Sequence, residues 1–172
     1  MPGAISPWEI KVPRDAIITR SPALANDPAV RAVTVIGLIA VGIIHSLEVP
    51  GQVSGAVWLT MGFTLLAVIA PGAGLWLLLR PSLLAWEFAG VVCALAAGGY
   101  VLTRSVPVPG DAGDAGNWLE PLGMAALITE GLVVIIVALI LVSIYRASHA
   151  SRPWVRYLGG MSSARPGGRA AA

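Results

Sequence analysis

Four long apolar runs dominate the chain and are separated by short polar or Gly/Pro-rich segments. They cover Ala29–Leu47, Val53–Leu79, Leu83–Thr103 and Leu119–Tyr145. A helix needs about 20 mostly apolar residues to cross a hydrocarbon core of roughly 30 Å, and each run is near that length. The pattern therefore predicts an all-α, integral membrane four-helix bundle. Its transmembrane domain is expected over residues 28–146, with spans at about 29–47, 53–79, 83–103 and 119–145.

Residues that favour helix starts precede the four runs. Such residues accept hydrogen bonds from the unpaired N–H groups of the first helical turn. We expect caps at Asp27 (with Pro28), at Ser54, at Ser82, and at Asn117 with Glu120 as a capping box. Inside the second run, Pro71 indicates either one long, kinked helix or a helix that ends there and is followed by a re-entrant segment.

Composition supports a lipid environment. The chain is 56% hydrophobic and only 12% charged, whereas soluble domains contain about 25% charged residues. The one cysteine, Cys93, has no partner for an internal disulfide and is expected to act as a small hydrophobe. The first 28 residues lack an apolar core segment, so we expect no cleavable signal peptide and an uncleaved anchor in the first span.

Cationic residues indicate the orientation of the spans. With four spans, ten of the eleven Lys and Arg residues fall on one side and only Arg104 on the other. Short cytoplasmic segments carry the excess of Lys and Arg, so both termini are expected in the cytoplasm (N-in/C-in). This predicts a multi-pass protein of the cell membrane. Residues 1–27 would be a cytoplasmic segment, and residues 147–172 a disordered, basic cytoplasmic tail.

Two acidic residues lie inside predicted spans. A charged group at the bilayer centre is unfavourable, so such residues are functional candidates by default. Glu130 lies near the middle of the fourth run and is either a proton or cation site or a neutral carboxyl that pins helices together. Glu87 lies near the cytoplasmic end of the third run, where contact with Arg80 or the headgroups is the expected role.

A second group of polar residues falls at the extracytoplasmic end. His45 and Glu48 share one helix face, and the connection before the fourth span adds further charge. The candidates are His45, Glu48, Arg104, Asp111, Asp114 and Glu120. A histidine with several carboxylates could bind a metal or a small molecule, whereas ion pairs such as Arg104–Glu120 explain the same residues. Whether a metal binds is left unknown.

Small residues on the third span predict close helix packing. Gly90, Ala94 and Gly98 recur every four residues, and helices in lipid approach closely through such positions. We expect this stripe to make an intramolecular contact, with a dimer interface as the alternative. Gly37 and Gly42 of the first span, and Gly123 and Gly131 of the fourth, are possible receiving positions.

Several classes of protein are excluded by missing residues. Bis-histidine haem binding needs paired transmembrane histidines, but the second histidine, His149, lies in the predicted tail. Membrane thiol oxidoreductases need cysteine pairs. The chain contains no phosphate-binding glycine loop, nucleophile elbow or zinc-protease helix. We therefore expect no cofactor, no nucleic-acid partner and no enzymatic activity.

Two segments carry a resemblance: Thr103–Gly110 (TRSVPVPG) and Gly116–Gly123 (GNWLEPLG), followed by Glu130. They resemble small, mostly uncharacterised four-span membrane proteins of actinobacteria and related bacteria. The resemblance implies roles for His45, Arg104, Glu120 and Glu130 but no established activity. Such proteins often carry an acidic residue or histidine after the proline of the first helix. Here Gly51 and Gln52 follow Pro50, which weakens the metal hypothesis.

Three hypotheses follow. The first is a non-enzymatic accessory or structural subunit, whose partners are the lipid bilayer and another membrane subunit or further copies of itself. The second is a small proton- or cation-coupled transporter or channel component that uses Glu130. The third is an extracytoplasmic metal or small-molecule binder around His45 and residues 104–120.

Overall fold

The computed structural model describes residues 23–52 and 56–150, and over these residues the chain is helical without strands. Five α-helices and one 3-10 turn follow in order: α2 (Ala23–Asn26), α3 (Pro28–Gln52), α4 (Val57–Leu79), α5 (Leu83–Ser105), η1 (Ala112–Asp114) and α6 (Pro121–Ala150). The expectations for residues 1–22, for a cap at Ser54 and for residues 151–172 lie outside the described residues.

The four predicted apolar runs are four long helices. Each of α3, α4, α5 and α6 is long and apolar enough to cross a membrane, and at most a third of each apolar stretch is buried inside the protein. Most of their large hydrophobic side chains therefore face outward. The helices run past the predicted ends: α3 continues through Pro50 to Gln52, and α6 continues to Ala150, into the segment expected to be a disordered tail.

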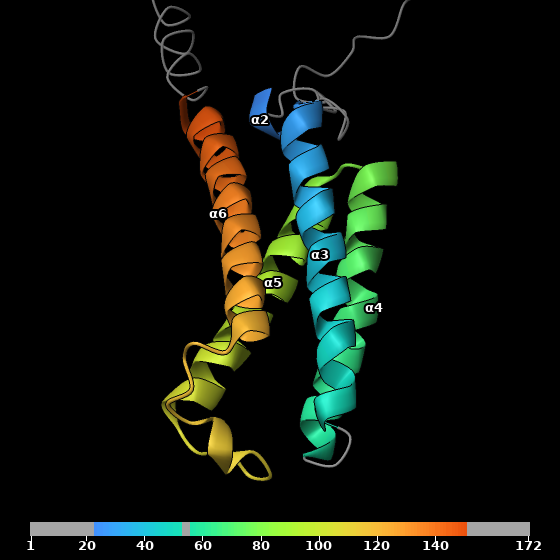
Figure 1. Ribbon diagram of the computed structural model, residues 1–172. Coiled ribbons are helices and arrows are strands. Elements are labelled where there is room, and N and C mark those ends of the chain that lie inside the picture. Colours follow the sequence, from blue (N-terminus) through green and yellow to red (C-terminus); the bar gives the residue numbers. More distant parts are fainter. Residues whose placement is uncertain (1–22, 53–55, 151–172) are drawn as a thin grey trace, which may run out of the picture.

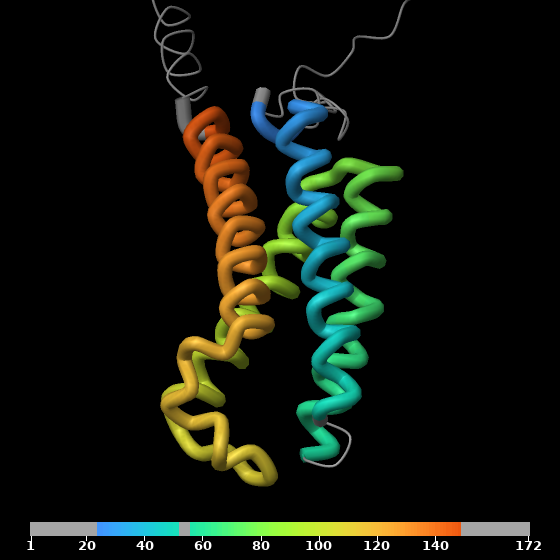
Figure 2. The backbone as a smooth tube through the Cα atoms, in the orientation of Figure 1, coloured from blue at the N-terminus to red at the C-terminus, as the bar shows by residue number. Residues whose placement is uncertain are grey.

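The helices form two neighbouring pairs. Figures 1 and 2 show α3 beside α4, and α5 beside α6, with α6 also lying along α3. Both described ends of the chain, α2 and the last turns of α6, lie at the same end of the bundle. The connection between α5 and α6, which contains η1, lies at the opposite end together with the last turn of α3 and the first turn of α4.

Two of the predicted helix caps are confirmed. Asp27 Oδ1 accepts hydrogen bonds from the N–H groups of Ala29 (2.8 Å) and Val30 (3.4 Å). Ser82 Oγ accepts one from Ala85 N–H at 3.2 Å. These side chains satisfy N–H groups that have no partner within the helix.

The predicted capping box at Asn117 is wrong. Helix α6 begins at Pro121, and Glu120 caps it by accepting from Leu122 N–H (3.0 Å) and Gly123 N–H (2.5 Å). Asn117 instead belongs to the turn before the helix, where its N–H donates to Asp114 O at 3.0 Å. Proline at the first helical position moves the start past Leu119, because proline fixes its φ and needs no N–H partner there.

Helix α4 passes through Pro71 without a break, so the prediction of one long helix is confirmed and the re-entrant alternative is wrong. The proline lies against α3 at Gly42. A Cβ atom added to Gly42 would collide with the Pro71 ring and lie 3.2 Å from Ala67 O. The glycine thus lets α3 and α4 approach closely, as small residues do in membrane helix pairs.

The packing prediction for the third span holds at Gly90 only. A Cβ atom there would lie 2.8 Å from Val137 Cγ1 on α6. Ala94 and Gly98 are exposed, and nothing lies within 4 Å of a Cβ built on Gly98. The buried face of α5 continues through Cys93, about 100° around the helix from Ala94. Of the glycines expected to receive the stripe, Gly123 of α6 does approach α5, where a Cβ atom would collide with the Tyr100 ring, whereas Gly37 of α3 meets Val133 of α6.

Candidate functional site: a polar cavity at the η1 end

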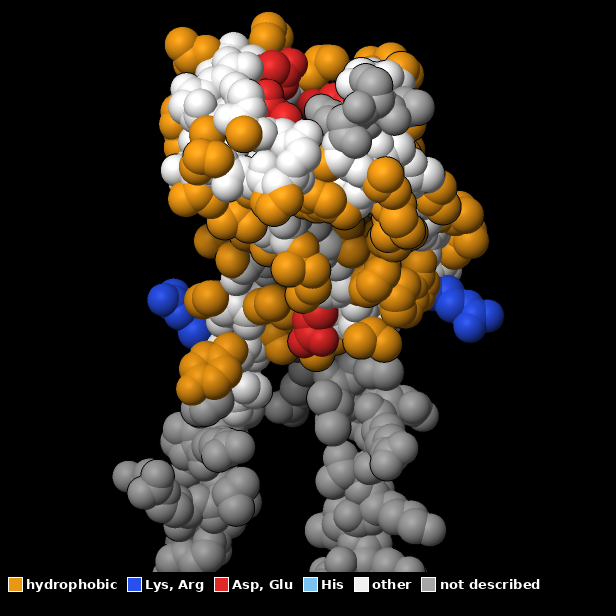
Figure 3. Space-filling view, turned by 90° about the horizontal axis from the view of Figure 1, so that it is seen from below, with side chains coloured by type: hydrophobic (Ala, Val, Ile, Leu, Met, Phe, Trp, Pro, Cys, Tyr) orange, Lys and Arg blue, Asp and Glu red, His pale blue; other side chains and the backbone are white. Residues whose placement is uncertain are grey.

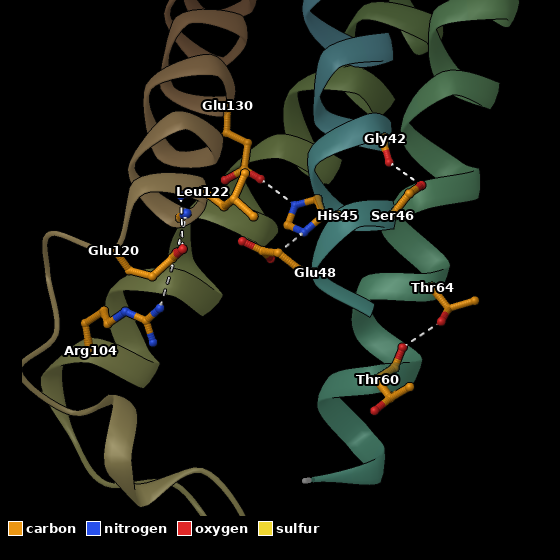
Figure 4. A network of polar contacts seen from close by, with 11 residues as sticks. Gly42, His45, Ser46, Glu48, Thr60, Thr64, Arg104, Glu120, Leu122 and Glu130 are labelled. Atoms are coloured by element: carbon orange, nitrogen blue, oxygen red, sulfur yellow. Dashed lines mark hydrogen bonds and ion pairs between the residues drawn. The ribbon is translucent and has the colours of Figure 1, made fainter. Parts of the chain in front are cut away.

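A hydrogen bond between His45 and Glu130 joins α3 to α6. His45 Nε2 lies 2.9 Å from Glu130 Oε1, and the two residues are only 5% and 1% exposed. Figure 4 shows the imidazole pointing from α3 toward the carboxyl of α6. The structure therefore brings together two residues that the sequence placed in separate groups, one in the outer cluster and one inside a span.

Glu48 completes the surroundings of the imidazole. Its Oε2 lies 3.5 Å from His45 Nδ1, one turn further along α3. This separation is long for a hydrogen bond, and His45 Nδ1 and Glu130 Oε2 are buried without any hydrogen-bond partner. Phe63 of α4 stacks on the imidazole, with ring centroids 5.4 Å apart. The histidine is thus held between two carboxyls and an aromatic ring.

Arg104 organises a second charged group at the end of α5. It is 7% exposed and contacts Asp114, while its Nη2 lies 3.9 Å from Glu120 Oε2. Its guanidinium also lies over the Tyr100 ring, 4.9 Å from the centroid. The predicted ion-pair interpretation is confirmed, with Asp114 closer to the arginine than Glu120. Arg104 O further accepts from Gly116 N–H at 2.9 Å, so this residue fastens the connection to α5.

Asp111 and Glu87 lie outside this arrangement. Asp111 lies in the connection before α6, where partial burial, followed by the negative charge of Asp114, raises its pKa above the usual value; Arg104 opposes this shift. Glu87 is exposed on α5, near the start of that helix and away from the η1 end. Neither residue lines the cavity described next.

A cavity of about 700 Å³ lies between the two helix pairs at the η1 end. Its polar lining comprises His45, Glu48, Arg104, Asp114, Glu120 and Glu130, and its remaining lining is mainly aliphatic and aromatic. Trp58 Nε1–H donates to Pro109 O at 3.0 Å and thereby links α4 to the α5–α6 connection across the cavity. Seen from this end, acidic side chains gather in the hollow (Figure 3). Ligand pockets typically have this size and this mixture of apolar walls and few polar groups.

The arrangement fits a small molecule better than a metal ion. Among residues 23–52 and 56–150, no group of three or more His, Cys, Asp or Glu side chains is arranged to hold a metal. Each carboxyl around His45 approaches a different ring nitrogen, so their oxygens do not converge on one point. The chemistry available is the holding of a proton between His45 and Glu130, and the binding of a polar group near the carboxyls.

The His45–Glu130 pair could have been predicted from the sequence, but the division into an intramembrane and an outer group separated the two residues. His45 lies seven residues before Gln52, where α3 ends, and Glu130 lies nine residues after Pro121, where α6 begins. At 1.5 Å per residue, two residues this far from the same bundle end have similar depths. The aromatic lining from Trp58, Phe63 and Tyr100 was also missed, because these residues lie on three different turns of two helices.

Replacing His45 with Leu is expected to destabilise the fold by about 3 kcal/mol, because Glu130 would remain buried without its partner. The double variant His45→Leu/Glu130→Leu is expected to recover part of this loss, since both polar groups are then gone. Glu48→Gln, which breaks no hydrogen bond, is the control and should change stability by less than about 1 kcal/mol. Denaturant unfolding in detergent measures these three variants, the single variant Glu130→Leu and the wild type; if the effects of His45→Leu and Glu130→Leu simply add up in the double variant, the pair is not energetically coupled.

No protein-family model, curated protein or solved structure matches this chain. The resemblance to small four-span bacterial membrane proteins therefore stays a prediction, and no activity or partner can be inferred from a relative. The functional argument depends on the cavity and its side chains.

Proposed function

We propose that this chain is a multi-pass protein of the bacterial inner membrane that binds a small molecule in the cavity at its η1 end. Both termini would be cytoplasmic, so the cavity would face the extracytoplasmic side. Four long apolar helices support the membrane location. The excess of Lys and Arg on the side of the termini supports the orientation.

One observation carries the binding role: a cavity large enough for an organic molecule has buried polar groups at its inner wall. His45 and Glu130 lie among apolar residues, where an unpaired carboxyl oxygen is unfavourable by about 1–3 kcal/mol. If His45 and Glu130 only held two helices together, apolar side chains would be sufficient at these positions. A polar wall within an apolar cavity is what orientation of a bound molecule requires.

The packing at the other end of the bundle favours binding over transport through Glu130. There the space between the helices is filled by fully or almost fully buried side chains, including Leu38, Leu77, Trp86, Val137 and Ile140. A transport path would need an opening through these residues. The cavity therefore supports a site that is entered from one side of the membrane.

An accessory role is the second candidate, and the exposed stripe on α5 favours it. Ala94 and Gly98 face outward, and a Cβ on Gly98 would meet nothing within 4 Å. Since small residues allow close helix approach in lipid, this surface suits a helix of another subunit or of a second copy. Binding in the cavity and association through α5 involve separate surfaces.

Filling the cavity tests the binding role. Gly62 of α4 lines the cavity, and a Cβ there meets nothing within 4 Å, so Gly62→Phe should place a ring in the cavity without a clash. Native mass spectrometry of protein extracted in mild detergent should show a bound small molecule in the wild type and its loss in Gly62→Phe. Gly72→Phe is the matched control, because Gly72 is equally open on the same helix and does not line the cavity. Equal occupancy in both variants would contradict the proposal.

Single cysteines test the orientation. Cys93 is fully buried, so an impermeant maleimide should leave the native thiol unmodified. Ala112→Cys in η1 is expected to be labelled in intact cells, and Ala147→Cys only after permeabilisation; both positions are exposed. Labelling of Ala147→Cys in intact cells would show that the orientation is the opposite of the one proposed.

Copurification tests the accessory role. Extraction in mild detergent should recover a stoichiometric membrane partner or a defined oligomer, and Gly98→Leu should abolish the association by blocking close approach. Gly99→Leu changes the neighbouring position, which is equally open but lines the cavity, and should leave the association intact. A solitary monomer in the wild type would remove this candidate.

A further inference from the structure

We infer that the cavity selects an organic cation: a molecule with an ammonium or similar positive group on an apolar body. This inference rests on the proposed binding function and names the chemical class of its ligand. Three features of the lining carry it: its charge, a buried carboxyl oxygen without a partner, and its aromatic rings.

The lining has more acidic than basic groups. Four carboxyl groups, those of Glu48, Asp114, Glu120 and Glu130, accompany the single arginine Arg104 and the single histidine His45. Even when His45 carries a proton, two negative charges are not balanced by the residues of the cavity. Opposite charges attract more strongly in such partly buried surroundings than in water, so the cavity favours a positive ligand group.

Arg104 does not offset this preference. Its guanidinium is already shared between Asp114, Glu120 and the ring of Tyr100. An anionic ligand would have to displace those carboxylates from the arginine and then remain beside them. A neutral ligand would leave the excess negative charge facing its apolar body.

Glu130 supplies an observation that is independent of the charge count. Glu130 lines the cavity and is 1% exposed, and among the described residues its Oε2 has no hydrogen-bond partner. A buried carboxylate oxygen of this kind is stabilised when a donor or a positive group approaches it. Glu48 is the more exposed of the two carboxyls around His45: its side chain is 15% exposed, and Figure 4 shows it beneath the His45–Glu130 pair. The positive group is therefore expected at the part of the cavity wall that Glu48 and Glu130 form.

The remaining lining suits an apolar body and the charge it carries. Trp58, Phe63 and Tyr100 place aromatic rings in the wall, and the faces of such rings attract cations. Tyr100 already holds the cation of Arg104 in this way. Leu59, Leu66 and Leu95 provide the aliphatic part of the wall. A bare metal ion would use neither surface, and the described residues hold no ligand set for one.

Two ions of the same shape and opposite charge test the inference. Wild-type protein in lipid nanodiscs is titrated by calorimetry with tetraphenylphosphonium or with tetraphenylborate, and empty nanodiscs correct for partition into lipid. The phosphonium should bind saturably and the borate should not. Glu48→Gln and Glu130→Gln should each weaken phosphonium binding about tenfold, since each removes one charge from the site.

Glu87→Gln is the matched control, because it removes one carboxylate from an exposed position away from the cavity, and it should leave the affinity unchanged. If Glu130→Gln does not fold, Glu48→Gln still tests the cation preference, because Glu48 makes no hydrogen bond with the described residues and its replacement should not disturb the fold. Equal binding of the two ions, or full affinity in Glu48→Gln, would overturn the cation preference and leave a cavity that binds by shape. If neither ion binds wild-type protein above the empty nanodisc, the cation inference fails, while loss of a native ligand in Gly62→Phe would still uphold the binding function.

Discussion

Polar groups that are buried between these helices depend on hydrogen-bond partners within the protein, because water does not reach them there. Short hydroxyl side chains meet this constraint on their own helix: Thr34 donates to Val30 O at 2.9 Å, and Ser46 donates to Gly42 O at 2.7 Å. Figure 4 shows the second of these, one residue along α3 from His45. Histidine and glutamate cannot do so as easily, since their polar atoms lie farther from the backbone. His45 and Glu130 therefore bond to each other, and this fixes α6 against α3 at one depth.

Small residues decide where the bundle is closed and where it is open. At Gly42 and Gly90 the neighbouring helix comes so near that a Cβ atom would collide with Pro71 or Val137. Gly62 and Gly99 line the cavity, and a Cβ atom there would meet nothing. Glycine thus brings helices together at the first two positions and leaves volume at the other two. The same residue type therefore permits close packing at some positions and leaves open space at others.

The sequence predicted the helices well because hydrophobic runs and caps are local properties. Asp27 and Ser82 cap as expected, since the accepting oxygen and the N–H groups lie within three residues. Contacts between helices were predicted poorly, because they depend on how each helix is rotated about its own axis, and hydropathy does not determine that rotation. Gly98 repeats the four-residue spacing of Gly90 but faces outward, because each step of four residues overshoots a 3.6-residue turn by about 40°, or about 80° over two steps. The His45–Glu130 contact spans 85 positions and needed the depth of both residues to be compared.

The candidate site depends on both local pattern and helix rotation, so its residues could be predicted from the sequence but their arrangement could not. The ionisable residues were identified because charge inside an apolar run is unusual wherever it occurs. Their division into two groups follows from helix pairing: Arg104 uses Asp114 and Glu120 within its own connection, so it is unavailable to Glu130 on the neighbouring helix. With the arginine occupied locally, the imidazole of His45 is the partner that the described residues offer the carboxyl of Glu130, and one oxygen remains unsatisfied. That carboxyl belongs to a residue of the cavity wall, where the proposed cation would approach it, and not to the dense end of the bundle.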